Sequence, residues 1–267
     1  MVENNWPAII YFTALAFLTG AAGGSFINCL SWRMVRAECV MKGRSRCPSC
    51  GNTLGVLDLI PVFSWIFLRG RCRFCRAAIP FRYLWSETLM GTVAVSLLFR
   101  YGLSLKAIFY LIFTFILLGE ALIDWEIYEI PDGFHLAAIL WWCVYLPYSG
   151  EPVTERLTAG LMGGVSIAGG LRLLTTAFDR MLGKESMGGA DIKLFFVTGL
   201  YLGFPGNLLN LIVSCIMGLI LAALSSGQRK EREEPSLIPF APAIAVGTWF
   251  CLLFGKWITS WYAGFSR

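Results

Sequence analysis

Apolar residues occur along this chain in long blocks that short polar stretches separate. We distinguish eight blocks, at residues 7–30, 84–98, 106–123, 134–146, 157–174, 192–202, 208–224 and 238–261. A helix needs about 17–25 residues to cross a bilayer, so the short blocks at 134–146 and 192–202 would be tilted or bent. The pattern predicts an all-α polytopic membrane protein with about eight transmembrane helices.

Composition agrees with this fold class. The 267 residues are 57% hydrophobic and only 15% charged, with a mean hydropathy of +0.65. Soluble domains of this length are rarely so apolar. Glu3 and no Lys or Arg precede the first block, whereas a cleavable signal begins with basic residues. We therefore expect this block to be retained as a helix.

Basic residues gather in the stretches that alternating crossings would place on one side. Most lie between the first two blocks, and the rest follow the fifth and seventh: Arg33, Arg36, Lys42, Arg44, Arg46, Arg69, Arg71, Arg73, Arg76, Arg82, Arg180, Lys184, Arg229, Lys230 and Arg232. The other side keeps Arg100, Lys106, Arg156, Lys256 and Arg267. Because basic loops remain cytoplasmic, we expect both termini outside and the stretch 33–82 inside. Topology then explains the net charge of +5 without a nucleic-acid partner.

The cytoplasmic stretch contains two cysteine hooks, Cys47-Pro-Ser-Cys50 and Cys72-Arg-Phe-Cys75. Their spacing is typical of a tetrahedral four-thiolate zinc site. Two disulfides or four unpaired thiols are the alternatives, and a reducing compartment disfavours the disulfides. Four thiolates leave no position for a catalytic water, so the predicted zinc is structural and supplies folding energy to a small knob.

Several catalytic chemistries lack their residues. His135 is the single histidine, so a His-Glu-x-x-His metalloprotease is excluded, and no Gly-x-Ser-x-Gly elbow or phosphate-binding glycine loop is present. We expect His135 to be an interfacial or loop residue.

Three aspartates lie at the ends of apolar blocks: Asp124, Asp132 and Asp191. Ionisable groups at membrane depth are costly and therefore mark working sites. The predicted orientation places all three at the cytoplasmic face. Two carboxyl groups that meet there can share one proton, so that one activates a water and the other donates a proton to a scissile amide.

Structural roles compete with this interpretation. Asp132 follows Pro131 and is a typical helix N-cap, Asp191 follows two glycines and is compatible with a cap, and Asp124 with a solvated helix end. Glu120, one turn before Asp124, and Glu87 either assist or make satisfied polar contacts. An ion-coupled transporter that uses intramembrane carboxylates and an assembly scaffold that docks through the cysteine knob are the alternative functions.

The motifs together resemble the type IV prepilin peptidases, which are membrane aspartic proteases of bacteria. The resemblance covers most of the chain. It rests on Gly24-Ser25-Phe26-Ile27-Asn28 through Arg33, the two cysteine hooks around residues 57–65, Arg82-Tyr83 with Glu87 and Gly91, Asp124 with Pro131-Asp132, and Gly188-Gly189-Ala190-Asp191-Ile192-Lys193.

This resemblance implies Asp124 and Asp191 as the catalytic pair, with Asp132 outside it. It divides the chain into a first transmembrane helix (1–32), a cytoplasmic zinc-binding domain (33–82) and a transmembrane aspartic protease domain (83–267). The family's second aspartate motif usually has glycine where this chain has Ala190. Alanine disfavours positive φ, so we expect either helical or extended backbone there, or a different loop.

The resemblance also implies a substrate, a second reaction and a location. The substrate is a type IV prepilin or pseudopilin precursor held in the lipid bilayer of the bacterial inner membrane, and the new N-terminus is methylated from S-adenosylmethionine. Gly24, Asn28, Glu87 and Gly91 are the residues that we expect to contribute to methyl transfer.

Overall fold

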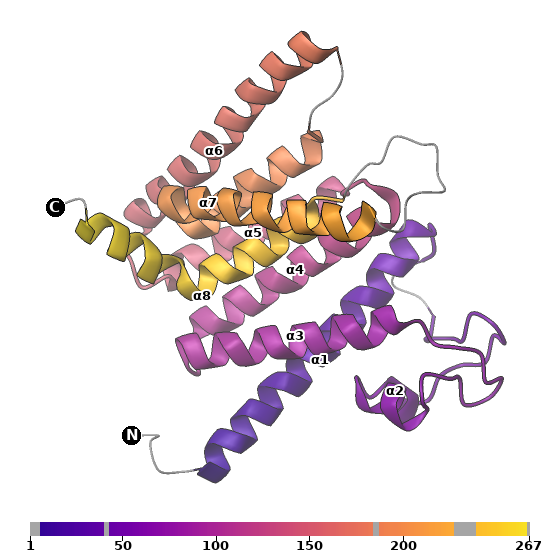
Figure 1. The fold of residues 1–267 in the computed structure, drawn as a ribbon. Helices are drawn as coiled ribbons and strands as arrows, with labels where there is room; N and C mark the ends of the chain where they lie inside the picture. The colour runs from indigo at the N-terminus through magenta and orange to yellow at the C-terminus, as the bar shows by residue number, and fades with distance from the viewer. Residues whose placement is uncertain (1–5, 40–42, 184–186, 227–238, 266–267) are drawn as a thin grey trace. The chain divides into compact units, whose positions relative to one another are not determined.

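The structure is a computed structural model that describes residues 6–39, 43–183, 187–226 and 239–265. These residues form helices and two isolated β-bridges. They make two compact units, Met1–Ala107 and Ile108–Arg267, which are described separately (Figure 1). Glu3 and part of the basic set used for orientation lie outside the described residues: Lys42, Lys184, Arg229, Lys230, Arg232 and Arg267.

Every predicted apolar block is helical where it is described. The long helices are α1 (Trp6–Val35), α3 (Phe81–Tyr101), α4 (Leu105–Ile127), α5 (Asp132–Tyr145), α6 (Val153–Leu182), α7 (Gly189–Ser226) and α8 (Ala241–Phe265). The short ones are η1 (Val56–Leu59), α2 (Phe63–Phe67) and η2 (Leu146–Tyr148). Five described helices, α1, α4, α6, α7 and α8, are long and apolar enough to cross a membrane. The fold is that of a helical membrane protein, and the count of eight spans stays a prediction.

Helix α7 folds back on itself. Gly203 has φ 69° and ψ 177°, which only glycine adopts readily, and Pro205 follows without an N–H to continue the helical bonds. Asn207 Nδ2 donates to the Phe195 carbonyl at 2.9 Å, whereas residues twelve apart in a straight helix are separated by about 18 Å. The two arms of α7 therefore correspond to the blocks predicted at 192–202 and 208–224.

In the first unit, α1 packs along α3 with very small separation. A Cβ on Gly24 would lie 3.0 Å from the Met90 Cβ, and a Cβ on Gly91 would lie 2.6 Å from the Phe17 ring. Glycine at these positions leaves the space that the Met90 side chain and the Phe17 ring of the facing helices occupy, as small residues do at closely packed helix interfaces. The first unit thus includes α3 as well as the cysteine knob.

In the second unit, α7 contacts α5, α6 and α8. A Cβ on Gly199 of α7 would lie 2.5 Å from the Gly164 Cα of α6, so small residues again set the helix separation. The aromatic rings of Phe113 and Tyr201 stack with centroids 3.6 Å apart and fill the core between the helices.

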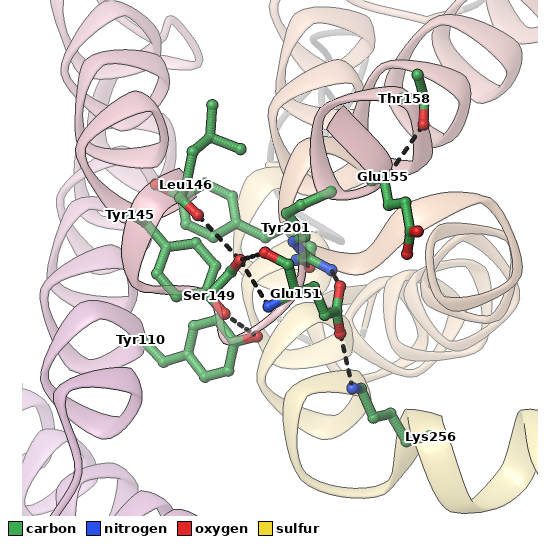
Figure 2. A network of polar contacts seen from close by, with 10 residues as sticks. Tyr110, Tyr145, Leu146, Ser149, Glu151, Glu155, Thr158, Tyr201 and Lys256 are labelled. Atoms are coloured by element: carbon green, nitrogen blue, oxygen red, sulfur yellow. Dashed lines mark hydrogen bonds and ion pairs between the residues drawn. The ribbon is translucent and has the colours of Figure 1, made fainter. Parts of the chain in front are cut away.

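Charged groups lie at both ends of α5. Asp132 begins this 14-residue helix, which is about 21 Å long. Beyond its other end, Glu151 pairs with Arg156 at 3.7 Å and with Lys256 at 3.5 Å (Figure 2). Arg156 and Lys256 therefore share one end of the unit, as the charge pattern predicts.

Candidate functional site

The four predicted zinc ligands form one cluster in the first unit. The sulfur atoms of Cys47, Cys50, Cys72 and Cys75 all lie within 4.8 Å of one another, and the Cys47 and Cys75 sulfurs are 3.8 Å apart. Zinc–sulfur bonds of about 2.3 Å in a tetrahedron separate the sulfurs by about 3.8 Å. The donor set and its spacing fit a four-thiolate metal site.

The two hooks have the same backbone conformation. The Cys47 N–H donates to Asn52 at 3.0 Å, and the Cys72 N–H donates to Ala77 at 2.8 Å. The residue after each second cysteine is left-handed, with φ 71° at Gly51 and φ 61° at Arg76. This repeated turn directs both thiols of each hook to the same point. At Arg76 the left-handed backbone conformation is one that L-residues disfavour.

The thiols of the cluster do not titrate alike. Burial raises the pKa of Cys47, but hydrogen bonds from the Cys50 and Ser49 backbone and from neighbouring thiols lower it to about 7. A backbone hydrogen bond at Ala77 lowers the pKa of Cys75, and burial with the neighbouring thiols raises it to about 11. One thiolate is therefore available near neutral pH, the form in which cysteine binds a metal.

The four residues predicted for methyl transfer meet at the α1–α3 interface. Asn28 Nδ2 donates to Ser86 Oγ at 2.8 Å, and the buried Glu87 accepts the Val62 N–H at 2.7 Å. Val62 has φ 65°, unusual for a β-branched residue, so Glu87 holds a strained turn of the knob. Gly24 and Gly91 serve in helix packing. The involvement of these residues in methyl transfer stays a prediction.

The two predicted catalytic aspartates both lie in the second unit. Asp124 is buried in the last turn of α4, and its Oδ2 accepts the N–H of Ala241, the first residue of α8, at 2.9 Å. Asp191 is half-buried in the first turn of α7. The Phe240 ring beside Ala241 lies 6.3 Å from the ring of Phe195, one turn after Asp191. Asp124 thus binds the N-terminus of α8 and Asp191 belongs to the N-terminal turn of α7, where the helix dipole favours negative charge.

Ala190 lies within the first turn of α7 and is not among the residues of positive φ. Of the conformations that the sequence left open, the structure has the helical one. The alanine therefore fits the backbone next to Asp191 without strain.

The N-cap prediction for Asp132 is wrong. Pro131 occupies the N-cap position of α5 without a side-chain cap bond, and Asp132 is the first helical residue. Its exposed carboxylate binds Lys193 Nζ of α7 at 2.6 Å instead, and this hydrogen bond and charge lower the pKa of Asp132. A partner on another helix has replaced the local one, which sequence spacing does not reveal.

The placement of His135 in a loop is also wrong, and its position at the membrane interface stays a prediction. His135 is 4% exposed in α5, and its Nδ1 lies 2.8 Å from Oε1 of the fully buried Glu120. The available signal was that both ionisable residues fall in or beside apolar blocks. The two residues lie on the consecutive helices α4 and α5, but the spacing along the chain does not show which faces of these helices meet, so the pairing itself required the structure.

An open groove of about 440 Å³ runs beside Asp191 between α5, α6 and α7. Asp132, His135 and Lys193 provide its polar groups, and its other lining residues are Leu136, Ile139, Ala168, Ile192, Phe196 and Val197. The groove is therefore mostly apolar with a small charged margin, a surface suited to an apolar helix.

Comparison with known proteins gives the same family for both units. Residues 18–101 match the bacterial peptidase A24 N-terminal domain, and residues 108–223 match the type IV leader peptidase family. No solved structure matches.

Curated relatives cover most of the chain. A prepilin leader peptidase/N-methyltransferase of Aeromonas hydrophila is 32% identical over 84% of this chain and 76% of its own length. The protein of that name from Bacillus subtilis (strain 168) is 30% identical over 93% of this chain and 97% of its own, and that of Dichelobacter nodosus is 33% identical over 80% and 72%. The two matched domains and these relatives show that the chain belongs to the type IV leader peptidase family.

Proposed function

We propose that this enzyme cleaves the leader from prepilin-like precursors at the cytoplasmic membrane face, with Asp124 and Asp191 as its catalytic pair. The relatives named prepilin leader peptidase/N-methyltransferase support the reaction and the substrate class. Geometry supports the residue assignment: the Ala241 N–H donates to Asp124 at 2.9 Å, and the ring of the preceding Phe240 lies 6.3 Å from the ring of Phe195, one turn after Asp191.

In this mechanism the two carboxyl groups hold one proton between them. The ionised group removes a proton from a water, whose oxygen attacks the scissile carbonyl, and the protonated group gives its proton to the departing amine. The Ala241 N–H orients Asp124 throughout. Hydrolysis then needs no covalent intermediate and no catalytic metal.

The mostly apolar groove beside Asp191 suits the apolar helix of such a precursor. A basic leader remains cytoplasmic for the same reason as this enzyme's own basic stretch. The junction between leader and helix would then reach the membrane surface near the two aspartates. The corresponding location is the bacterial inner membrane, with both termini periplasmic and the cysteine knob cytoplasmic.

Methylation of the new N-terminus follows from the relatives' names, and S-adenosylmethionine supplies the methyl group. Gly24 and Gly91 are occupied by helix packing, so they have no surface to offer this cofactor. Of the four predicted residues, Asn28 and Glu87 are the two with polar side chains that could contact the cofactor.

The cysteine cluster would hold one structural zinc ion that stabilises the knob. The measurement is metal content of the purified protein. One equivalent of zinc in the wild type and almost none in Cys72→Ser are expected. An unchanged zinc content in that variant would contradict the assignment.

The direct test of the proposed catalysis uses Asp124→Asn and Asp191→Asn in membranes, with precursor cutting read by mass. Each variant should lose cutting by at least a factor of about 10², because asparagine neither shares nor transfers the proton. Asp132→Asn is the matched control and should retain substantial activity. If either dyad variant cuts at the wild-type rate at equal protein levels, the pair is not catalytic.

A further inference from the structure

Glu120 and His135 form a buried ionisable pair that the proposed mechanism does not use. Glu120 is 0% exposed on α4, one turn before Asp124, and His135 is 4% exposed on α5, one turn after Asp132. Glu120 Oε1 and His135 Nδ1 are 2.8 Å apart. Carrying such a pair into an apolar interior usually costs more free energy than hydrophobic residues of similar volume, which points to a role other than stability.

Both side chains also keep a second polar atom that has no hydrogen-bond partner among the described residues. These atoms are Glu120 Oε2 and His135 Nε2. A pair kept only for its hydrogen bond would be expected to satisfy them, since an unsatisfied buried polar atom is costly. The open Nε2 leaves the ring able to gain or lose a proton without breaking its bond to Glu120.

The ring lies close to the part of α7 that carries Asp191. His135 lines one groove together with Asp132, Ile192 and Lys193, and Ile192 directly follows Asp191 in the chain. The charged groups around it are Glu120 on α4, Asp132 on α5 itself, and Asp191 and Lys193 on α7. Asp132 and Lys193 bind one another at 2.6 Å, and Glu120 is bonded to the ring itself at 2.8 Å, so Asp191 is the member of the proposed pair on which a charge of the ring can act.

We propose that His135, held by Glu120, is a positioning residue whose ring charge sets how tightly Asp191 holds the proton of the catalytic pair. This inference rests on the proposed function. A positive charge nearby favours the ionised form of a carboxyl group. The pair therefore sets the pH range in which the two aspartates share one proton, without touching the substrate.

The first test is a titration that does not depend on cutting. Because His135 is the only histidine, ring-¹⁵N-histidine labelling of the full chain, purified in nanodiscs with a histidine-free tag, gives the signals of one ring. Coupling between two sites is reciprocal. The midpoint of the ring's titration should therefore fall by about half a pH unit or more in Asp191→Asn, and by less than about 0.2 units in the control Glu155→Gln, which changes an exposed carboxylate at the start of α6.

The second test is the pH profile of precursor cutting. His135→Asn keeps a donor near the Nδ1 position but cannot carry charge, and Glu120→Gln keeps the hydrogen bond but removes the anion that favours the protonated ring. Both should move the acid limb of kcat to higher pH and lower kcat at neutral pH at least about threefold, with KM nearly unchanged. The double variant should lose no more than the larger single effect.

The outcomes test the coupling between His135 and Asp191 separately from the proposed function. If Asp191→Asn leaves the ring titration unchanged, the coupling does not exist, whatever the activity assay shows. A loss of activity in His135→Asn that is equal at every pH would indicate a structural role and overturn the inference. Cutting that survives Asp124→Asn and Asp191→Asn would remove the proposed function, while the measured coupling would still stand as a physical fact.

Discussion

Arg156 stabilises the break in α7, and its replacement tests how much this contributes to the stability of the second unit. Its guanidinium is buried, donates through Nη2 to the Tyr201 carbonyl, and pairs with Glu151 at 3.7 Å. The Tyr201 carbonyl has no helical donor because the residue four positions later is Pro205, which lacks an N–H. Arg156 therefore satisfies a carbonyl that the sequence of α7 leaves open.

The expected cost of Arg156→Met follows from these contacts. A hydrogen bond from a charged donor to a buried carbonyl contributes about 1.5–3 kcal/mol. The ion pair with the partly exposed Glu151, whose side chain is 40% accessible, adds up to about 1 kcal/mol after solvent screening. The total predicts a loss of about 2–4 kcal/mol in the free energy of unfolding.

Lys256→Met is the matched control. Lys256 binds the same carboxylate at 3.5 Å, but its side chain is 67% exposed, so its loss should cost less than about 1 kcal/mol. The measurement is thermal unfolding of both variants in the same detergent, followed by tryptophan fluorescence. If Arg156→Met were no less stable than Lys256→Met, the reasoning about the open carbonyl would be refuted.

Three further predictions concern single positions and their controls. Gly199→Ala should destabilise the second unit by about 1–3 kcal/mol through overpacking, because its Cβ would lie 2.5 Å from the Gly164 Cα. The control Gly170→Ala should be neutral or stabilising, because a Cβ there would have no atom of the other described helices within 4 Å. Equal unfolding temperatures of the two variants would contradict this prediction. Gly51→Ala should lower the stability of the knob and Arg76→Gly should raise it, each by about 1 kcal/mol, because both positions have left-handed backbone. Zinc retention against a chelator measures this stability. A change of the same sign in both variants would contradict the prediction. Lys193 lowers the pKa of Asp132 in the folded state, so this carboxylate stabilises the fold above its unfolded pKa of about 3.9 and that contribution is lost as pH falls through the lower folded value. The stability difference between wild type and Asp132→Asn should accordingly be constant from about pH 5 to 8 and decrease as the pH falls below about 3.9, and a difference that stays constant in acid would argue against the ion pair.

Much of the fold could be predicted from the sequence. The apolar blocks predict the helices to within a few residues, because a chain in lipid must satisfy its backbone hydrogen bonds within each segment. The separate blocks before and after Gly203 likewise predict the two arms of α7. The cysteine spacing predicts a metal-ligand cluster whose sulfur atoms do converge. Local spacing was sufficient in each case.

Contacts between side chains of different helices could not be predicted in the same way. Spacing favours a cap for Asp132, but the structure pairs it with Lys193, and it places His135 against Glu120 inside the bundle. Both errors have the same origin, since a polar side chain takes whichever partner the packing brings to it.

The sequence by itself determined where the helices form, which residues can hold a metal, and which carboxyl groups are candidates for chemistry, because those properties depend on local composition and spacing. Only the tertiary structure decided that Asp124 binds the start of α8, that α7 reverses at Gly203, and that Glu120 and His135 are buried together. The physical reason is that electrostatic and hydrogen-bond energies depend on distance and burial, and the packing of helices far apart in the chain sets both.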